Sequence, residues 1–377
     1  MAGFNDAATQ TDYSIVFSAN GTFKETREIL LASYASNIIT IEEYALLFEE
    51  NSSNNLDFPY YNYPPFNLES QSEAECRANF RVEKHHIPLV EDALQIPQYF
   101  ICDQGTVCEG TEGLCMLLKR YSFPCRYSDM IPIFGRPVPE LCMICNTVTD
   151  WIYAHHNHRI TQWNRTILNP LELEKYAEAV FNQGAPLSNC FGFVDGTVRP
   201  IARLGENQRL LYNGHKRVHG LKFQSVVLPN GLFSHLYGPV EGRKHDAAML
   251  ADSGLYNSLR THAVSTTGQP MCIYGDPAYP LRIHLQAPFR QRALTPQQQA
   301  YNGSMSAVCS SVEWLFSDIV NYFKFLDFKK NLKIGLSQVG KMYIVCAVLQ
   351  NVLTCLYGNS TSQFFDLDPP SLEDYFS

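Results

Sequence analysis

The sequence predicts an α/β fold, with a mixed sheet flanked by helices and preceded by a helical N-terminal domain. Three observations support this. Short apolar runs bounded by turn residues follow residue 189, apolar residues recur at helical spacing between residues 76 and 185, and an Asn-Gly pair joins two of the apolar runs. Hydrophobic residues make up 45% of the 377 residues, which is enough to build a core.

Acidic residues gather in the first 75 residues. This segment holds twelve acidic and two basic residues, so it carries −10 and the remaining residues carry +2 of the total charge of −8. An acidic segment is a poor DNA binder, because Lys and Arg make the phosphate contacts. We expect residues 1–75 to form an acidic leader, partly helical or disordered, ahead of a near-neutral body.

The cysteines and the longest apolar run both predict a soluble intracellular protein. Cys142 and Cys145 form a CxxC pair without a second pair at zinc-ribbon spacing, so we interpret them as packing residues with reduced thiols. The apolar run at 342–357 contains Gln350 and Asn351, and it predicts a buried helix. We therefore expect no membrane partner.

Residues 76–185 predict a helical domain. Apolar residues recur at spacings of three and four over 111–120 and again over 141–153. Ser128 and Asp129 predict the start of a short helix between these two runs, and a Gly-Arg-Pro sequence at 135–137 predicts a break. Helix, turn and longer helix is typical of a helix-turn-helix that reads DNA, although an ordinary helical bundle gives the same pattern.

Residues 186–358 predict the sheet domain, and residues 359–377 a C-terminal tail. We expect strands at 190–195, 221–228, 232–237 and 271–276, and helices at 246–262, 304–328 and 342–356. Asn230 and Gly231 predict a hairpin turn, because Asn-Gly accepts positive φ values. A crossover from the first to the fourth strand would make these two strands parallel.

Two acids lie where the predicted parallel strands end. Asp195 precedes Gly196, and Asp276 precedes Pro277. Since ligands of open α/β sheets bind at the carboxyl ends of strands, we expect the two carboxylates to share one site. Close carboxylates repel each other unless a cation separates them, and hard divalent cations prefer oxygen ligands. Glu313, on a predicted helix, adds a third acid, and two cations held in this way can act on a phosphodiester.

Each of these acids, taken alone, is more typical of a turn, a cap or a solvated helix face. The local motifs around them carry a more specific signal. The segment from about 189 to 358 resembles the DDE domain of PIF/Harbinger-type transposases and of their domesticated, nuclease-like relatives. The resemblance lies in five motifs in order: GFVDGT (192–197), YNGHKR (212–217), GRKHD (242–246), YGDPAYP (274–280) and SVEWLF (311–316).

The resemblance implies an RNase H-like sheet and a DNA endonuclease or transposase. Its acidic triad falls on Asp195, Asp276 and Glu313, which would hold divalent cations, Mg²⁺ or Mn²⁺, two in number. The Asp of its His-Asp pair falls on Asp246, which would be a further metal ligand. From the residues alone, Asp246 would instead cap the following helix, and both interpretations stay open. Cys309 stands where the family often has Arg, and this change removes a cation near the site.

DNA is the expected partner. The following residues, most of them basic, could neutralise phosphates, although a solvated surface is the alternative: Arg199, His215, Lys216, Arg217 and Lys222. The resemblance also implies a Myb- or SANT-like partner protein that recognises DNA and brings about a nuclear location. Without that partner the chain would stay in the cytoplasm. A homo-oligomer is a further expectation.

Two other functions compete with an active DDE enzyme. One is a domesticated, non-catalytic DNA-binding or scaffold protein that retains the DDE fold, which Cys309 and the acidic leader favour. The other is an unrelated Mg²⁺-dependent phosphatase or hydrolase. This last class is disfavoured because the sequence contains neither a Walker motif nor a Gly-x-Ser-x-Gly elbow.

Overall fold

The computed structural model describes residues 23–51, 58–205 and 208–377, and the chain divides into two compact units. The first unit, Met1–Pro59, contains a helical hairpin of α1 (Phe23–Ala35) and α2 (Ile41–Glu50). A capping box starts α2: the Thr40 hydroxyl accepts a bond from the Glu43 N–H, and the Glu43 carboxylate accepts one from the Thr40 N–H.

The second unit, Tyr60–Ser377, opens with a helical region and a small two-stranded sheet. Its elements, in order, are η1 (Tyr60–Asn62), η2 (Leu68–Ser70), α3 (Glu73–Phe80), η3 (Lys84–His86), α4 (Ile87–Ala93), β1 (Tyr99–Ile101), β2 (Val107–Glu109), α5 (Gly110–Ser122), η4 (Tyr127–Met130), α6 (Ile131–Phe134), α7 (Val138–His156), α8 (His158–Thr161) and α9 (Pro170–Asn182). The two predicted long helices are present as α5 and α7, which pack against each other. The helical N-terminal region is thus confirmed.

At the predicted break between these helices, Arg136 links α5 to α7 through ion pairs with a glutamate of each helix. The Arg136 guanidinium donates to both carboxylate oxygens of Glu112 on α5, at 2.7 and 2.8 Å, and to Glu140 on α7 at 3.0 Å. Bidentate bonds of this kind fix geometry as well as charge. Because Arg136 is used inside the bundle, it is not displayed for DNA. A DNA-reading role for the helix-turn-helix pattern stays a prediction.

A six-stranded mixed sheet follows. Its strands are β3 (Cys190–Pro200), β4 (Tyr212–Asn213), β5 (Val218–Val227), β6 (Phe233–Glu241), β7 (Cys272–Gly275) and β8 (Leu285–Gln286). The order is β4-β5-β3-β7-β8, and β6 also pairs with β5. Neighbours are antiparallel from β4 to β3 and between β5 and β6, whereas β3-β7 and β7-β8 are parallel. The predicted parallel pairing of the first and fourth strands is confirmed.

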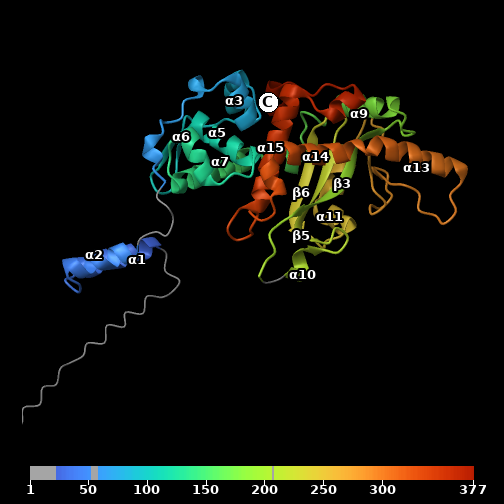
Figure 1. The fold of residues 1–377 in the computed structure, drawn as a ribbon. Helices are drawn as coiled ribbons and strands as arrows, with labels where there is room; N and C mark the ends of the chain where they lie inside the picture. The colour runs from blue at the N-terminus through green and yellow to red at the C-terminus, as the bar shows by residue number, and fades with distance from the viewer. Residues whose placement is uncertain (1–22, 52–57, 206–207) are drawn as a thin grey trace, which may run out of the picture. The chain divides into compact units, whose positions relative to one another are not determined.

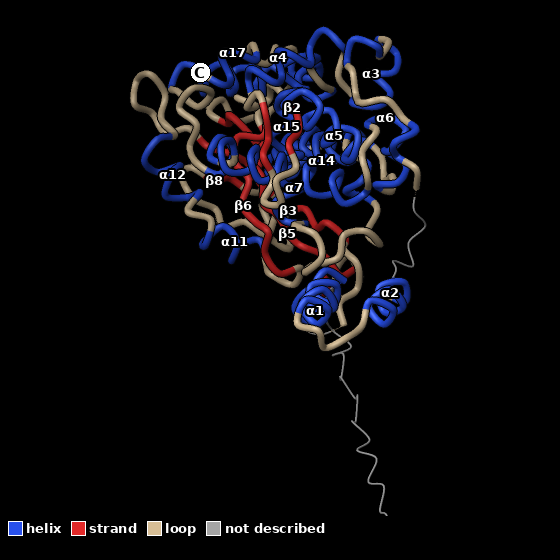
Figure 2. Tube along the Cα trace, turned by 90° about the vertical axis from the view of Figure 1, so that its left-hand side faces the viewer, coloured by secondary structure: helices blue, strands red, loops and turns tan. Residues whose placement is uncertain are grey.

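Helices cover both faces of this sheet, as Figure 2 shows with strands in red between helices in blue. Adjacent residues of one strand point to opposite faces. On one face Phe193 and its ladder partner Val227 belong to the core shared with α14 (Ser311–Tyr322) and α15 (Val339–Tyr357). On the other face Val194 and its partner Val226 join the core built with α9 and α12 (Leu255–His262).

The remaining helices are α10 (Gln208–Leu211), α11 (Asp246–Asp252), α13 (Pro296–Cys309), η5 (Lys324–Asp327), α16 (Ser360–Phe365) and α17 (Leu372–Phe376). In Figure 1, α13 projects away from the sheet, in line with α14.

The apolar helix α15 is the one described helix that is long and apolar enough to cross a membrane, but most of it is buried inside the protein. Its polar residue Asn351 is hydrogen-bonded inside the core. The Asn351 side chain accepts a bond from the Phe233 N–H at 2.9 Å, and donates to the Phe233 carbonyl at 2.8 Å. An amide thus satisfies the backbone of β6 in the core, and the prediction of a buried helix is confirmed.

Several predicted boundaries were wrong. The helix predicted at 246–262 is divided into α11 and α12, because Gly254 adopts a positive φ of 69° between them. The helix predicted at 304–328 begins at Pro296 and is interrupted at Ser310. In the hairpin turn, Gly231 has a positive φ of 81°, and Asn230 does not.

Candidate active site

Asp195 lies inside a strand and not at its end, which corrects the prediction. The ladder between β3 and the parallel strand β7 ends at Val194, opposite Gly275. Beyond this point β3 continues to Pro200, because it stays paired with the antiparallel strand β5, and Asp195 lies opposite Ser225. Asp195 is therefore held on one side by β5, while its other side opens where β7 stops.

Asp276 follows directly after β7, as predicted. Its Oδ1 accepts a bond from the Ala278 N–H at 2.9 Å, and its carbonyl accepts one from Tyr279 at 3.1 Å. This tight turn fixes the carboxylate at the strand end. The carboxyl ends of β3's parallel segment and of β7 thus bring Asp195 and Asp276 to the same edge of the sheet.

Glu313 lies in the first turn of α14. The break at Ser310 between α13 and α14 creates a helix start at this position, which the single long helix predicted from the sequence would not have. A carboxylate in the first turn is stabilised by the positive end of the helix dipole. Glu313 is exposed and therefore accessible to ligands.

Asp246 does not cap the helix that follows it, so that interpretation was wrong. His245 occupies the N-cap position of α11, and Asp246 is the first helical residue. The Asp246 carboxylate instead pairs with the Lys222 ammonium at 2.8 Å. It also lies against Gly196, where a Cβ atom would come within 2.2 Å of Asp246 Oδ1. A residue larger than glycine at position 196 would therefore displace Asp246.

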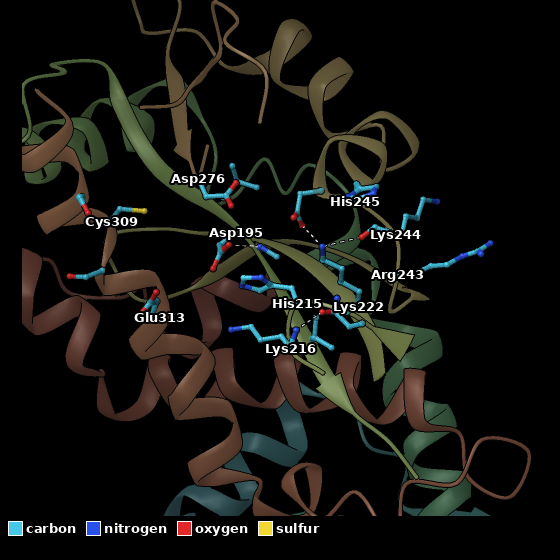
Figure 3. A pocket seen from close by; sticks show the side chains of 18 residues that line it. Asp195, His215, Lys216, Lys222, Arg243, Lys244, His245, Asp276, Cys309 and Glu313 are labelled. Carbon is cyan, nitrogen blue, oxygen red and sulfur yellow. Dashed lines mark hydrogen bonds and ion pairs between the residues drawn. The ribbon is translucent and has the colours of Figure 1, made fainter. Parts of the chain in front are cut away.

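These four acids line one cavity of about 670 Å³. Figure 3 shows Asp195 between Asp276 and Glu313, with Lys216, Arg243 and Lys244 on the other side. The lining residues are Val194, Asp195, Gly196, Val198, Asn213, Gly214, His215, Lys216, Lys222, Arg243, Lys244, His245, Asp246, Asp276, Ser306, Cys309, Ser310 and Glu313. Acids far apart in the sequence thus face a shared space with cations around it.

The acids influence one another's protonation. Burial, together with the negative charges of Asp276, Asp246 and Glu313, raises the pKa of Asp195 to about 6, although a hydrogen bond from the Gly196 N–H lowers it in part. Burial and then Asp246 also raise the pKa of Asp276, whereas the hydrogen bond from the Ala278 N–H, Lys222 and Arg290 lower it. Neighbouring carboxylates that resist ionisation are expected where a bound cation would stabilise the charged forms.

The donor set suits a hard divalent cation, because it consists of carboxylate oxygens. Within the described part of the chain, no three of these acids bring their oxygens within 4.8 Å of one another. The acids surround the cavity and do not converge on a single point. This spacing is more compatible with cations that each contact some of the acids, with water completing their coordination, than with one ion held by all.

One comparison bears directly on this site. Residues 194–351 match the DDE superfamily endonuclease family. The matched segment contains all four cavity acids, and the match indicates a transposase-like nuclease domain in this part of the chain. DDE endonuclease domains generally use divalent metal ions, which agrees with the oxygen-rich donor set. The comparisons with curated proteins and with solved structures found no match.

Three of the residues predicted to bind DNA lie in the exposed turn of the β4-β5 hairpin in the nuclease domain. His215 and Lys216 line the cavity, whereas Arg217 is exposed but does not line it. Asn213 holds this turn in place: its side chain accepts a bond from the Lys216 N–H at 2.8 Å and donates to the Gly242 carbonyl at 2.6 Å. The motif at 212–217 and the motif at 242–246 are therefore joined directly.

The other two residues predicted to bind DNA, Arg199 and Lys222, make their hydrogen bonds and ion pairs within the protein. Arg199 donates to the Phe316 carbonyl at 3.0 Å, and its guanidinium lies over the Tyr343 ring at 5.1 Å. Lys222 is buried, with its ammonium paired to Asp246 and bonded to the Lys244 carbonyl at 3.1 Å. Lys222 thus positions Asp246, whereas Arg199 joins β3 to α14 and α15, and the sequence alone indicated neither contact.

Arg243 and Lys244 line the cavity of the nuclease domain, and the sequence reasoning missed them as candidates for phosphate contact. The signal was available, because both belong to the GRKHD motif beside Asp246. Cys309 also lines the cavity, at the end of α13. Burial and then the negative charge of Asp195 raise the pKa of its thiol to about 12, so this side chain is neutral at physiological pH.

Proposed function

We propose that the chain is a divalent-metal-dependent DNA endonuclease and transposase of PIF/Harbinger type, which cleaves and transfers DNA strands. The observation that carries the proposal is the single cavity lined by Asp195, Asp246, Asp276 and Glu313 within the segment that matches the endonuclease family. The PIF/Harbinger assignment rests on the order of the five sequence motifs, three of which contain the triad acids.

In this proposal Asp195, Asp276 and Glu313 are the catalytic acids and hold two Mg²⁺ or Mn²⁺ ions, with Asp246 as a further ligand. When bound, such ions stabilise negative charge on phosphate oxygens and make a water or hydroxyl a better nucleophile. Asp195 supplies a fixed carboxylate, since the β3-β5 ladder continues through it. Lys222 holds Asp246 against Gly196, and so keeps this acid at the cavity wall.

The substrate would be held by cations at the rim of the cavity. His215 and Lys216 from the hairpin turn, and Arg243 and Lys244 from the motif before α11, would contact phosphates on the side facing the acids. Electrostatic contacts of this kind position DNA without reading its sequence. This fits a further part of the proposal, that a Myb- or SANT-like partner supplies sequence recognition and nuclear location to an otherwise acidic chain.

A plasmid-nicking assay tests the proposed activity. The full chain is incubated with supercoiled plasmid and Mn²⁺ or Mg²⁺, with and without a chelator. We expect nicking that needs the metal and that falls at least about 100-fold in Asp276→Asn, because loss of a metal ligand removes a large electrostatic contribution. Glu178→Gln, an exposed acid on α9 outside the cavity, is the matched control and should nick normally. Equal nicking by both variants would contradict the proposal.

A second candidate is a non-catalytic DNA-binding or scaffold protein, which Cys309 favours. A neutral thiol lines the cavity at the position where the resemblance implies a cation. Under this alternative Asp276→Asn would leave DNA binding unchanged, and no divalent metal would support nicking by the parent chain. Direct titration with Mn²⁺ separates the two candidates, since only the enzyme needs cations bound by the acids.

A further inference from the structure

A second group of potential metal ligands lies in the helical region, outside the acidic cavity. Glu83, His85 and His86 each offer one ligand atom, and these three atoms lie within 4.8 Å of one another. Glu83 Oε2 is 3.6 Å from His85 Nε2 and 3.9 Å from His86 Nδ1. None of the three residues lines the acidic cavity.

The donors of this cluster differ in chemistry from those of the cavity. Two imidazole nitrogens and one carboxylate oxygen suit Zn²⁺ or a related transition ion, whereas Mg²⁺ prefers oxygen alone. Donors placed about 2.1 Å from a tetrahedral zinc lie about 3.4 Å apart. The two separations between the carboxylate and the imidazoles, 3.6 and 3.9 Å, are only a few tenths of an ångström wider. His85 is 65% exposed, so its ring can move by this amount without disturbing the core.

The surroundings hold the cluster in place. The Arg77 guanidinium on α3 binds Glu83 Oε1, which leaves Oε2 directed at the two imidazoles. Tyr357, the last residue of α15, has its hydroxyl oxygen 2.9 Å from His86 Nδ1, and the same oxygen accepts a bond from the Glu83 N–H at 3.0 Å. Partners that orient ligating side chains are typical of built metal sites.

The Tyr357 hydroxyl oxygen lies 2.9 Å from His86 Nδ1, a hydrogen-bond distance that is shorter than the roughly 3.4 Å between two ligands of one tetrahedral zinc. Tyr357 is therefore a hydrogen-bonding partner of the cluster and not a fourth ligand. Since Tyr357 ends α15, an ion at the cluster would connect the segment after α3 to the core helix of the nuclease domain.

We propose that Glu83, His85 and His86 bind one Zn²⁺ ion, which fastens the segment at 83–86 to the end of α15. The site is structural and independent of the proposed nuclease. Without a metal the same three groups would form only an ion pair or hydrogen bonds between the Glu83 carboxylate and the two imidazoles. Metal titration distinguishes the two arrangements, because an ion pair needs no zinc.

The test uses the full chain carrying Asp195→Asn and Asp276→Asn, so that the acidic cavity no longer competes for metal. After chelator treatment, Zn²⁺ is titrated by calorimetry in excess Mg²⁺, and Co²⁺ is used as a spectroscopic probe, since thiolate ligands would add a charge-transfer band. We expect one equivalent of Zn²⁺, nitrogen and oxygen ligands, and a melting temperature that rises with Zn²⁺.

Adding His85→Ala should weaken Zn²⁺ binding at least about 10-fold and remove the rise in melting temperature. His155→Ala, at another exposed histidine outside the cluster, is the matched control and should bind as the parent does. If His85→Ala does not fold, Glu83→Gln, which keeps the side-chain shape, replaces it. Equal zinc stoichiometry and affinity in the cluster variant and the parent would overturn the proposal, whatever the nicking assay gives.

Discussion

The Lys222 ammonium lies 2.8 Å from Asp246 Oδ1 at the wall of the acidic cavity. Lys222 is 9% exposed and Asp246 is 20% exposed, so both charges are largely removed from solvent. Removing one partner from such a pair leaves an uncompensated charge, which is more costly than the pair itself is stabilising.

A double-mutant cycle measures this coupling. We expect Lys222→Met to lower the free energy of unfolding by about 2–4 kcal/mol in metal-free buffer, because Asp246 then stands unpaired beside other acids. Asp246→Asn added to Lys222→Met should recover part of this loss. Urea unfolding of the four proteins gives the coupling, and additive effects would show that the pair is not a unit.

Gly196→Ala should disrupt the position of Asp246 through a steric clash. Its Cβ would meet Asp246 Oδ1 at 2.2 Å, so either β3 or the Asp246 carboxylate must shift. We expect a loss of about 1–3 kcal/mol in unfolding free energy and weaker Mn²⁺ binding. Gly303→Ala, in the exposed middle of α13 with nothing within 4 Å, is the control, and it should be neutral or stabilising by up to about 1 kcal/mol. Similar effects of both substitutions would argue against the close packing at Gly196.

Metal binding should depend on pH through Asp195. Its pKa is raised from 3.8 to about 6, so this carboxyl group holds its proton below pH 6 and ionises above it. Since cations bind the ionised form, Mn²⁺ affinity should fall as the pH is lowered through 6. Calorimetric titrations at pH 5 and pH 7.5 compare the two states, and a pH-independent affinity would exclude Asp195 as a ligand.

The same raised pKa predicts the effect of Asp195→Asn on the metal-free protein. The folded state binds the proton more tightly than the unfolded state, so ionisation above pH 6 destabilises the fold, and this cost disappears below pH 3.8. Replacing the acid by an isosteric amide should therefore raise the unfolding free energy at pH 7.5 by about 1–3 kcal/mol. The variant should gain nothing from added Mn²⁺, and a destabilised variant would contradict the sign of the pKa shift.

Phosphate contacts at the rim should appear as salt-dependent DNA affinity. Lys216→Ala and Arg243→Ala should each weaken binding to any duplex, and should each make the slope of log affinity against log salt shallower by about 1. Lys175→Ala on α9, which pairs with Glu172 away from the cavity, is the control. An unchanged salt slope in both rim variants would place the DNA elsewhere.

Cys309→Arg tests the departure from the family pattern. A cation at this position would face Asp195 and Glu313, whose charges already act on the Cys309 thiol. We expect tighter DNA binding and a several-fold increase in nicking, because the added charge lies beside the proposed site of the phosphate. Increased binding without any nicking would support the scaffold alternative.

The sheet and its parallel pair could be predicted because apolar runs, turn residues and crossover connections are local or nearly local signals. The length of β3 could not be predicted, since residues 196–200 (Gly-Thr-Val-Arg-Pro) contain a glycine and a proline and no apolar run, and their strand conformation depends on pairing with β5. The interruption at Ser310 between α13 and α14 could not be predicted either. The sequence around it is compatible with helix on both sides, and tertiary packing decides where α13 ends.

In the candidate site, too, some features could be predicted from the sequence and others could not. The positions of Asp276 and Glu313 in motifs were visible in the sequence, but the partner of Asp246 was not. Lys222 looked like one more surface cation until β5 placed it in the interior next to α11. Arg199 likewise belongs to Tyr343 and Phe316, residues more than a hundred positions away. Charge patterns along the chain give no information about such long-range contacts.

The continuous pairing of β3 through Asp195 has a consequence for how the site can respond to a ligand. Asp195 cannot be repositioned without breaking the pairing of β3 with β5. In contrast, Asp276 belongs to a turn, and Glu313 lies at the start of α14, just after the helix interruption at Ser310. Any adaptation to an incoming phosphodiester must therefore come from the turn that carries Asp276 and the start of α14 that carries Glu313, both moving toward Asp195, which stays in place. Slowed amide hydrogen exchange on loading should be concentrated at 276–279 and 310–314 and be small along β3.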